Sequence, residues 1–172
     1  MAIDLKECVR DVPDWPQQGV IFRDITPLLR DAEALDQTVR ALAEWGKELR
    51  PDLVLGAEAR GFILGAAIAR EIQCGFVPAR RPGKLPPETV GATYALEYGQ
   101  NTLELHPETV GRGNRVLIHD DVLATGGTVE AIAGLVEGLG AEVVGVAFII
   151  ELAFLKGRER LANYPLHSLI QY

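Results

Sequence analysis

Short apolar runs alternate along the chain with longer segments in which apolar residues recur at helical spacing. The short runs have the length and composition of buried strands. They lie at residues 53–56, 76–79, 115–119, 143–150 and 166–170. Helices are expected at residues 31–50, 61–72, 128–139 and 154–162. Because strands and helices alternate, we predict an α/β fold with a central parallel sheet flanked by helices.

The N-terminal part of the chain is less regular. Residues 1–10 are predicted to form a short helix, and residues 19–25 an extended segment. Asp31 is placed to begin the first long helix, because its carboxylate can accept hydrogen bonds from N–H groups of the first helical turn. Pro51 is predicted to end that helix, since proline has no N–H group to donate.

Residues 93–106 alternate between polar and apolar positions around the turn Gly99-Gln100-Asn101. Alternation across a turn predicts a β-hairpin or a mobile flap. Glu97 and two tyrosines, Tyr94 and Tyr98, lie near its tip. A flap that closes over a substrate would exclude water and place Glu97 for proton transfer. The alternative is an exposed hairpin with an ordinary surface glutamate.

Length and composition indicate one globular domain. The chain has 172 residues, of which 48% are hydrophobic and 24% charged, and this is enough for a sizeable core. Its net charge of −7 argues against binding to nucleic acid or to an anionic membrane. An anionic ligand must therefore be held by local donors and a few placed cations.

The sequence lacks the signals of export and of a zinc site. It starts with Met-Ala-Ile-Asp-Leu-Lys-Glu, which has no apolar signal-peptide core, and no run approaches the ~18 apolar residues that span a bilayer. We therefore expect a cytoplasmic protein. Cys8 and Cys74 are too few for a disulfide framework, and the chain has no C-x-x-C pair.

The most informative segment follows the strand predicted at residues 115–119. Two acids, Asp120 and Asp121, precede a loop of small residues that leads into a helix: Ala124, Thr125, Gly126, Gly127 and Thr128. Helix N-termini bind phosphate through free N–H groups, glycines let the backbone approach closely, and carboxylates accept hydrogen bonds from a sugar diol. The segment is neither a Walker loop nor G-x-G-x-x-G. It predicts adjacent phosphate and ribose sites, although small-residue loops also occur without a ligand.

Two other segments carry groups that suit anions. Residues 57–62, Ala-Glu-Ala-Arg-Gly-Phe, follow a strand and open a helix, so their N–H groups and Arg60 can bind a second anion. Arg80, Arg81 and Lys84 lie in one loop. The alternatives are a helix-capping turn and a solvated basic loop. Because parallel strands bind ligands beyond their carboxyl ends, the turn at 57–61 and the loop at 120–128 are expected to face one site.

The segment from Asp120 to Thr128 resembles the phosphoribosyl-pyrophosphate (PRPP) loop of type I phosphoribosyltransferases. This resemblance implies that Asp120 and Asp121 bind the ribose hydroxyls of PRPP. It also implies that the 5-phosphate is bound by Ala124, Thr125, Gly126, Gly127 and Thr128.

Nearly the whole chain is similar, in the same order, to the adenine-specific branch of that family. The segments that point to adenine are Phe22-Arg23-Asp24-Ile25, Gly83-Lys84-Leu85-Pro86 and Leu96-Glu97-Tyr98-Gly99. The resemblance implies a single type I phosphoribosyltransferase domain over residues 1–172, with a base-binding hood at 1–30 and a flexible β-hairpin flap at 88–106. The implied reaction converts adenine and PRPP to AMP and pyrophosphate. Mg²⁺ would be bound through substrate and water, with no direct protein ligand.

The resemblance also implies residue roles. Ile21, Phe22 and Arg23 would line the adenine pocket. Glu97 would handle a proton of the base, with Tyr98 beside it on the catalytic flap. Pyrophosphate would be bound by Ala57, Glu58, Ala59, Arg60, Arg80 and Lys84. Arg60 would stabilise its developing charge, and Arg80 would reach the neighbouring subunit of a homodimer.

Two positions depart from the family pattern. Ala59 stands where the family often has serine, which removes a hydroxyl donor from the pyrophosphate turn. His119 replaces a usual aliphatic residue and is expected to be a tolerated strand residue rather than a catalyst.

Two alternative functions remain open. The same family includes transferases for other nucleobases, and base choice depends on a few pocket groups. Some proteins with this fold bind PRPP only as regulators of nucleic-acid binding. Those regulators usually carry a DNA-binding extension or a basic face, and this sequence shows neither.

Overall fold

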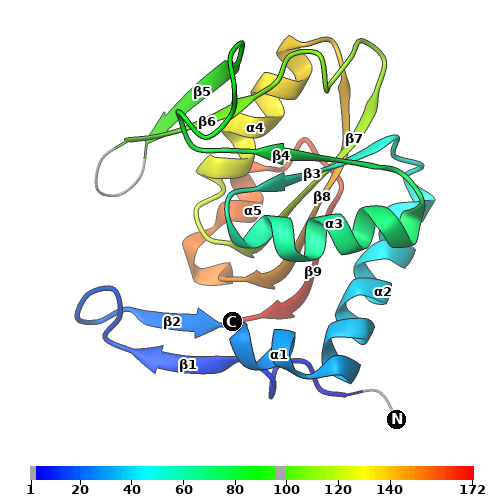
Figure 1. The fold of residues 1–172 in the computed structure, drawn as a ribbon. Helices are drawn as coiled ribbons and strands as arrows, with labels where there is room; N and C mark the ends of the chain where they lie inside the picture. The colour runs from blue at the N-terminus through cyan, green and yellow to red at the C-terminus, as the bar shows by residue number, and fades with distance from the viewer. Residues whose placement is uncertain (1–2, 96–99) are drawn as a thin grey trace.

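A five-stranded parallel sheet forms the centre of the computed structural model, which describes residues 3–95 and 100–172. Its strands are β3 (Leu53–Ala57), β4 (Gly75–Ala79), β7 (Arg115–Leu123), β8 (Glu142–Glu151) and β9 (Leu166–Gln171). They lie in the order β4-β3-β7-β8-β9, and every neighbouring pair is parallel (Figure 1). The predicted α/β fold is confirmed.

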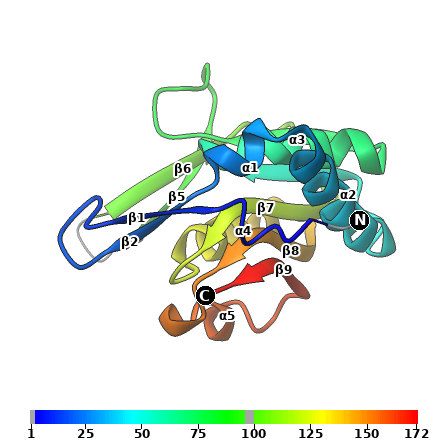
Figure 2. The same ribbon diagram turned by 90° about the horizontal axis from the view of Figure 1, so that it is seen from below.

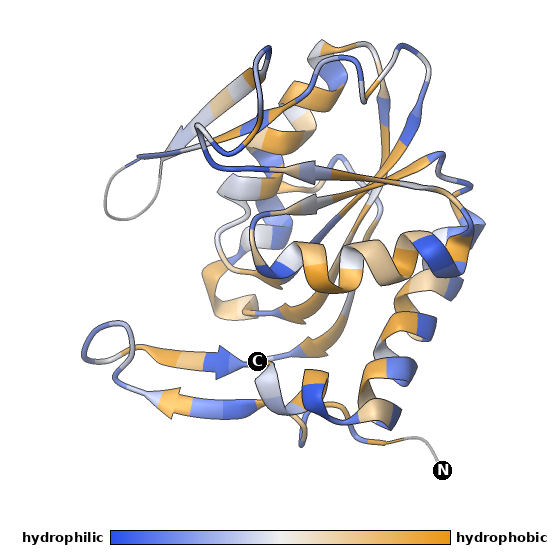
Figure 3. Cartoon of the chain, in the orientation of Figure 1, coloured by the Kyte–Doolittle hydropathy of each residue, from blue (hydrophilic) through white to orange (hydrophobic). Residues whose placement is uncertain are grey.

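Helices cover both faces of this sheet. α2 (Ala32–Glu48) and α3 (Arg60–Ile72) pack on one face, and α4 (Gly127–Gly138) packs on the other. Successive side chains of β7 point to opposite faces of the sheet. Leu117 lies in the core beneath α2 and α3, and Ile118 lies in the core beneath α4. The sheet strands are therefore mainly hydrophobic, as their orange colour in Figure 3 shows.

The first long helix begins as the sequence predicted. Oδ1 of Asp31 accepts hydrogen bonds from the N–H groups of Glu33 and Ala34 at 3.0 and 2.9 Å. A short helix that was not predicted, α1 (Thr26–Arg30), precedes it. None of the helices in the described part of the chain has both the length and the apolar character that a membrane crossing requires.

Two β-hairpins project to the side toward which β3 points (Figures 1 and 2). The N-terminal hairpin pairs β1 (Arg10–Pro13) with β2 (Ile21–Asp24), and the second pairs β5 (Val90–Ala95) with β6 (Gln100–Leu105). The hairpin predicted from the alternation of residues 93–106 is confirmed, but Gln100 and Asn101 lie in β6 and not in the predicted turn. Both hairpins lie next to the edge of the sheet where ligands of parallel α/β folds bind.

Two predicted helices are wrong. Residues 5–8 form turns with hydrogen bonds between residues three apart, because so short a segment has little helical stability of its own. The basic helix predicted at 154–162 is interrupted by Lys156, whose φ of 56° is left-handed. It is replaced by a 3₁₀ turn, η1 (Ala153–Leu155), and by the single-turn helix α5 (Gly157–Arg160).

Candidate functional site

The acid pair lies where β7 extends beyond one of its two neighbours. β7 pairs with β3 only as far as His119, whereas its pairing with β8 continues to Leu123. Asp120 and Asp121 therefore lie inside β7, not at its end as the run at 115–119 predicted. The strand is longer than its apolar run because β8 still supplies backbone partners after β3 has ended.

The two carboxylates have different surroundings. Asp121 is buried, and its Oδ2 lies 2.5 Å from Nε of Arg60 in an ion pair that lacks hydrogen-bond alignment. Asp120 lines the cavity described below, and its Oδ1 accepts a hydrogen bond from the Asp121 N–H at 2.9 Å. Burial raises the pKa of both carboxyls; the Asp121 charge adds to the rise at Asp120, whereas Arg60 opposes it at Asp121. Asp120 thus faces the cavity while Asp121 holds Arg60 beside it.

Close packing of α3 against β7 brings Arg60 to the acids. Arg60 is the first residue of α3, and a Cβ at Gly61 would lie 2.9 Å from the His119 carbonyl oxygen, so only glycine permits this approach. On its other side, the Arg60 guanidinium carbon lies 5.0 Å from the ring centroid of Phe22. Arg60 therefore connects the acid pair with the N-terminal hairpin.

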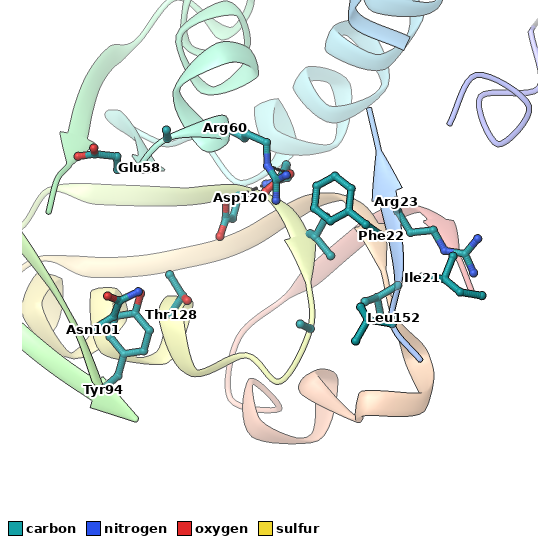
Figure 4. A pocket seen from close by; sticks show the side chains of 15 residues that line it. Ile21, Phe22, Arg23, Glu58, Arg60, Tyr94, Asn101, Asp120, Thr128 and Leu152 are labelled. Carbon is teal, nitrogen blue, oxygen red and sulfur yellow. Dashed lines mark hydrogen bonds and ion pairs between the residues drawn. The ribbon is translucent and has the colours of Figure 1, made fainter. Parts of the chain in front are cut away.

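A cavity of about 570 Å³ lies among these groups. Side chains from the N-terminal hairpin, the start of α3, the second hairpin and β7 face it (Figure 4). A smaller cavity of about 110 Å³ adjoins it. Four residues line both cavities: Asp120, Val122, Ala124 and Thr128. The two cavities are therefore parts of one site.

The loop before α4 forms the wall of the smaller cavity. All five of its predicted phosphate-binding residues line that cavity: Ala124, Thr125, Gly126, Gly127 and Thr128. Gly126 has a φ of 82°, which glycine adopts without strain, and α4 begins at the next residue. No side chain caps the first turn of α4, so its N–H groups are available to an anion. This is the geometry of an anion site at a helix N-terminus.

The N-terminal hairpin presents one aromatic side chain to the larger cavity. The three predicted base-site residues all line that cavity: Ile21, Phe22 and Arg23. Phe22 packs edge-on against Trp15, with ring centroids 4.5 Å apart. Arg23 turns its guanidinium away in Figure 4, because it pairs with Asp11 and lies 3.7 Å from the ring centroid of Tyr172. Phe22 is thus the hairpin side chain best placed to contact a ligand.

The predicted pyrophosphate ligands are only partly brought together. Glu58, Ala59 and Arg60 line the larger cavity, whereas Ala57, Arg80 and Lys84 line neither. Glu58 accepts hydrogen bonds from Nε of Arg80 at 3.1 Å and from the Arg81 N–H at 2.9 Å. Arg80 also donates to the Lys84 carbonyl oxygen at 3.1 Å. In this structure Arg80 therefore stabilises the turn at Glu58 without lining either cavity.

The predicted catalytic flap residues, Glu97 and Tyr98, lie outside the described residues. Both strands of the second hairpin nevertheless contribute to the larger cavity. Tyr94 of β5 lies opposite Asn101 of β6, and both line the cavity wall. The hairpin that carries Glu97 is therefore anchored at the site by each of its strands.

Leu152 lines the larger cavity but was not identified from the sequence. Other lining residues missed in the same way are Val20, Asn101 and Val122. Leu152 is the first residue after β8, so its place at the carboxyl end of a parallel strand was the available signal.

His119 does not line either cavity. Its ring is fully buried, Nδ1 lies 3.0 Å from the Ala147 carbonyl oxygen, and Nε2 has no hydrogen-bond partner among the described residues. Burial lowers the pKa of His119 to about 4. The ring is therefore neutral near pH 7, with Nδ1–H as the donor to Ala147.

Within the described residues, no three His, Cys, Asp or Glu side chains are grouped closely enough to hold a metal ion. The carboxylates at the site are the adjacent pair Asp120 and Asp121 and the braced Glu58. These carboxylates can accept hydrogen bonds from hydroxyl groups, whereas the uncapped N–H groups at the start of α4 suit phosphate oxygens.

Comparison with known proteins gives one consistent family. The Phosphoribosyl transferase domain family matches residues 29–165. The chain is 52% identical over 171 residues to an adenine phosphoribosyltransferase of Desulfitobacterium hafniense, covering 99% of each chain.

Solved structures of similar proteins agree with this match. A crystal structure of adenine phosphoribosyltransferase from Thermoanaerobacter pseudethanolicus superposes with a TM-score of 0.95 at 47% identity, over 98% of each chain. One from Saccharomyces cerevisiae, in complex with an imino-altritol bisphosphate and adenine, superposes with a TM-score of 0.90 at 38% identity over 96% of each chain.

Proposed function

The chain belongs to the adenine phosphoribosyltransferase family, and we propose on that basis that it transfers the 5-phosphoribosyl group of PRPP to adenine, forming AMP and pyrophosphate. The observation that carries this proposal is the shared boundary of the two cavities. Asp120, Val122, Ala124 and Thr128 line both. A ribose at that boundary would join a 5-phosphate in the smaller cavity to a base and a leaving group in the larger one.

The base would bind on the side of the larger cavity formed by the N-terminal hairpin, with residues 1–30 acting as a hood. Phe22 offers an aromatic ring and Leu152 an apolar side chain, a combination that suits a planar heterocycle. Backbone groups at Ile21 and Arg23 would recognise the base edge, because the Arg23 guanidinium is held by Asp11 and Tyr172.

The ribose phosphate would bind to β7 and the loop that follows it. The N–H groups of the first turn of α4 would bind the 5-phosphate, with the hydroxyls of Thr125 and Thr128 as further donors. Asp120 and Asp121 would accept hydrogen bonds from the ribose hydroxyls. Such bonds stabilise a charged carboxylate and would offset the rise that burial causes in the pKa of Asp120.

The leaving group would be stabilised by the turn before α3. N9 of adenine attacks C1 of the ribose while the bond from C1 to the pyrophosphate oxygen breaks, which inverts C1. Negative charge then grows on pyrophosphate, and the Arg60 guanidinium with the N–H groups of Glu58 and Ala59 would stabilise it. The close packing at Gly61 fixes α3 against β7 and so holds the backbone of Arg60, the first residue of α3, in place.

The second hairpin would act as the flap over residues 88–106. Glu97 would accept the proton that N9 loses, with Tyr98 beside it on the flap. Tyr94 and Asn101 anchor the two strands at the cavity. Closure would exclude water, which would otherwise hydrolyse PRPP.

Mg²⁺ is proposed to enter with PRPP, because Mg²⁺ gives up its hydration water reluctantly and is usually bound together with substrate phosphates. It would be bound by the substrate diol, pyrophosphate and water, with no direct protein ligand, and would supply further neutralisation of the leaving group. Asp120 and Asp121 would then act mainly through the ribose hydroxyls.

We further propose a cytoplasmic homodimer on the strength of the family resemblance. Arg80 and Lys84 would then serve pyrophosphate across the subunit interface rather than within their own cavity. Sedimentation of the purified protein tests the dimer directly, and a monomer at assay concentration would contradict it.

The proposed reaction is tested with purified protein, PRPP and Mg²⁺ against adenine, hypoxanthine, guanine, xanthine, uracil and orotate. AMP formation preferred by orders of magnitude is the expected result. Turnover of another base would keep the PRPP site and overturn the assignment of the base pocket. Tight PRPP binding without turnover of any base would favour a regulator.

A further inference from the structure

The helix α5 lies directly against the loop that lines the smaller cavity. A Cβ at Gly157, its first residue, would collide with the Ala124 carbonyl oxygen and lie 3.1 Å from the Gly126 nitrogen. A Cβ at Gly126 would in turn lie 3.0 Å from the Gly157 carbonyl oxygen. The two backbones therefore touch with no side chain between them. A displacement of α5 toward the loop must therefore displace the loop, and a displacement away from it removes the loop's support.

An ion pair between Arg158 and a buried carboxylate, Glu151, holds α5 in this position. Glu151, at the end of β8, accepts hydrogen bonds from Arg158 at 2.9 Å from Nε and 2.6 Å from Nη2. Ser168 and Gln171 of β9 donate to the same carboxylate at 2.6 and 3.3 Å. The Glu151 side chain is 5% exposed and the Arg158 side chain 46%, so a bidentate ion pair with additional donors forms around a buried carboxylate. Such networks fix geometry more strongly than exposed pairs do.

The other arginine of α5 lacks this arrangement. Arg160 lies 3.7 Å from Glu130, and their side chains are 45% and 57% exposed. Exposed pairs of this kind contribute little to stability. The two arginines are therefore a matched pair on one helix: Arg158 is anchored to the sheet and Arg160 is not.

We propose that Glu151 and Arg158 are positioning residues for PRPP binding, which act by holding Gly157 against the phosphate loop. The pair anchors α5 to the ends of β8 and β9, and α5 in turn sets where the loop from Ala124 to Gly126 presents its N–H groups. This inference rests on the proposed function, and it assigns a role in phosphate binding to residues that line neither cavity.

The test compares Gly157→Ala with Gly134→Ala in steady-state kinetics. Gly134 lies in α4, where a Cβ would have no atom within 4 Å, so this variant controls for the substitution itself. Gly157→Ala is expected to raise the KM for PRPP by about 10- to 100-fold, because a shift of about 1 Å in a binding group has effects of that order. The KM for adenine should stay unchanged, as should both constants in Gly134→Ala.

Arg158→Lys tests the anchor without removing its charge. Lysine cannot form the bidentate pair with a carboxylate. The PRPP KM of Arg158→Lys should therefore rise by a smaller factor than that of Gly157→Ala, whereas Arg160→Lys should leave the PRPP KM unchanged. If Gly157→Ala does not fold, the PRPP KM of Arg158→Lys alone tests the positioning role. A fall in thermal stability with unchanged PRPP KM would overturn the positioning role. Wild-type protein that forms no AMP would instead refute the proposed function.

Discussion

Replacing His119 with valine removes a buried, neutral imidazole from the centre of the sheet. The ring is fully buried, and burial lowers its pKa from 6.5 to about 4. In the unfolded chain the ring is solvated and takes up a proton below about pH 6.5. Between these two values the unfolded state binds more protons than the folded state, so the free energy of unfolding falls as the pH falls.

The size of this effect follows from the pKa difference. A tenfold change in an acid dissociation constant is worth about 1.4 kcal/mol. The His119 pKa is about 4 in the folded state and about 6.5 in the unfolded state. This difference therefore lowers the free energy of unfolding of the wild-type protein by about 3 kcal/mol between pH 7 and pH 4. That is a large part of the roughly 5–15 kcal/mol that stabilises a typical domain. The valine variant lacks the imidazole, so its free energy of unfolding should fall by about 3 kcal/mol less over the same pH range.

Urea unfolding of both proteins at several pH values between about 7 and 4 measures the difference. The raised pKa values of Asp120 and Asp121 act in the opposite direction, but these carboxyls are present in both proteins and largely cancel in the comparison. Parallel stability curves would refute a neutral buried His119. Because its ring lines neither cavity, the KM for PRPP at pH 7 should change by no more than a few-fold.

Three further predictions concern the site itself. Asp121→Asn removes the charge that holds Arg60, and kcat/KM for PRPP should fall by about tenfold or more; unchanged kinetics would remove Asp121 from the ribose site. Glu97→Gln should lower kcat by about 10²-fold if the carboxylate accepts the base proton, and a loss of only a few-fold would reduce Glu97 to a flap residue. Leu152→Ala should raise the adenine KM by about tenfold through lost apolar contact, with the PRPP KM unchanged; an equal rise in both would contradict a contact with the base.

Local features could be predicted from the sequence because neighbouring residues determine them. The cap of α2 at Asp31, the alternation in β5 and β6 and the glycine turn before α4 each depend on a few adjacent residues. Their physical causes are equally local: a carboxylate near free N–H groups, a period of two, and a backbone angle that glycine tolerates. The fold class followed from the alternation of such elements.

Features that depend on more than one segment could not be predicted. The length of β7 depends on where β3 ends and how far β8 continues, so Asp120 and Asp121 were placed at the end of a strand that contains them. The helix expected at 154–162 is broken at Lys156, and the next residue, Gly157, packs against the backbone of the loop from Ala124 to Gly126. Each case depends on a contact between residues distant in the sequence.

The sequence by itself determined the parallel sheet and the glycine turn before α4, and it supplied residue types that suit a phosphate and a ribose, because periodicity and short-range geometry specify these features. Only the tertiary structure decided which groups meet. It paired Arg60 with Asp121, turned Arg23 toward Asp11 and brought Leu152 to the cavity. The first depends on packing at the Gly61 contact, the second on the register of β1 and β2, and the third on where β8 ends, and no single segment specifies these.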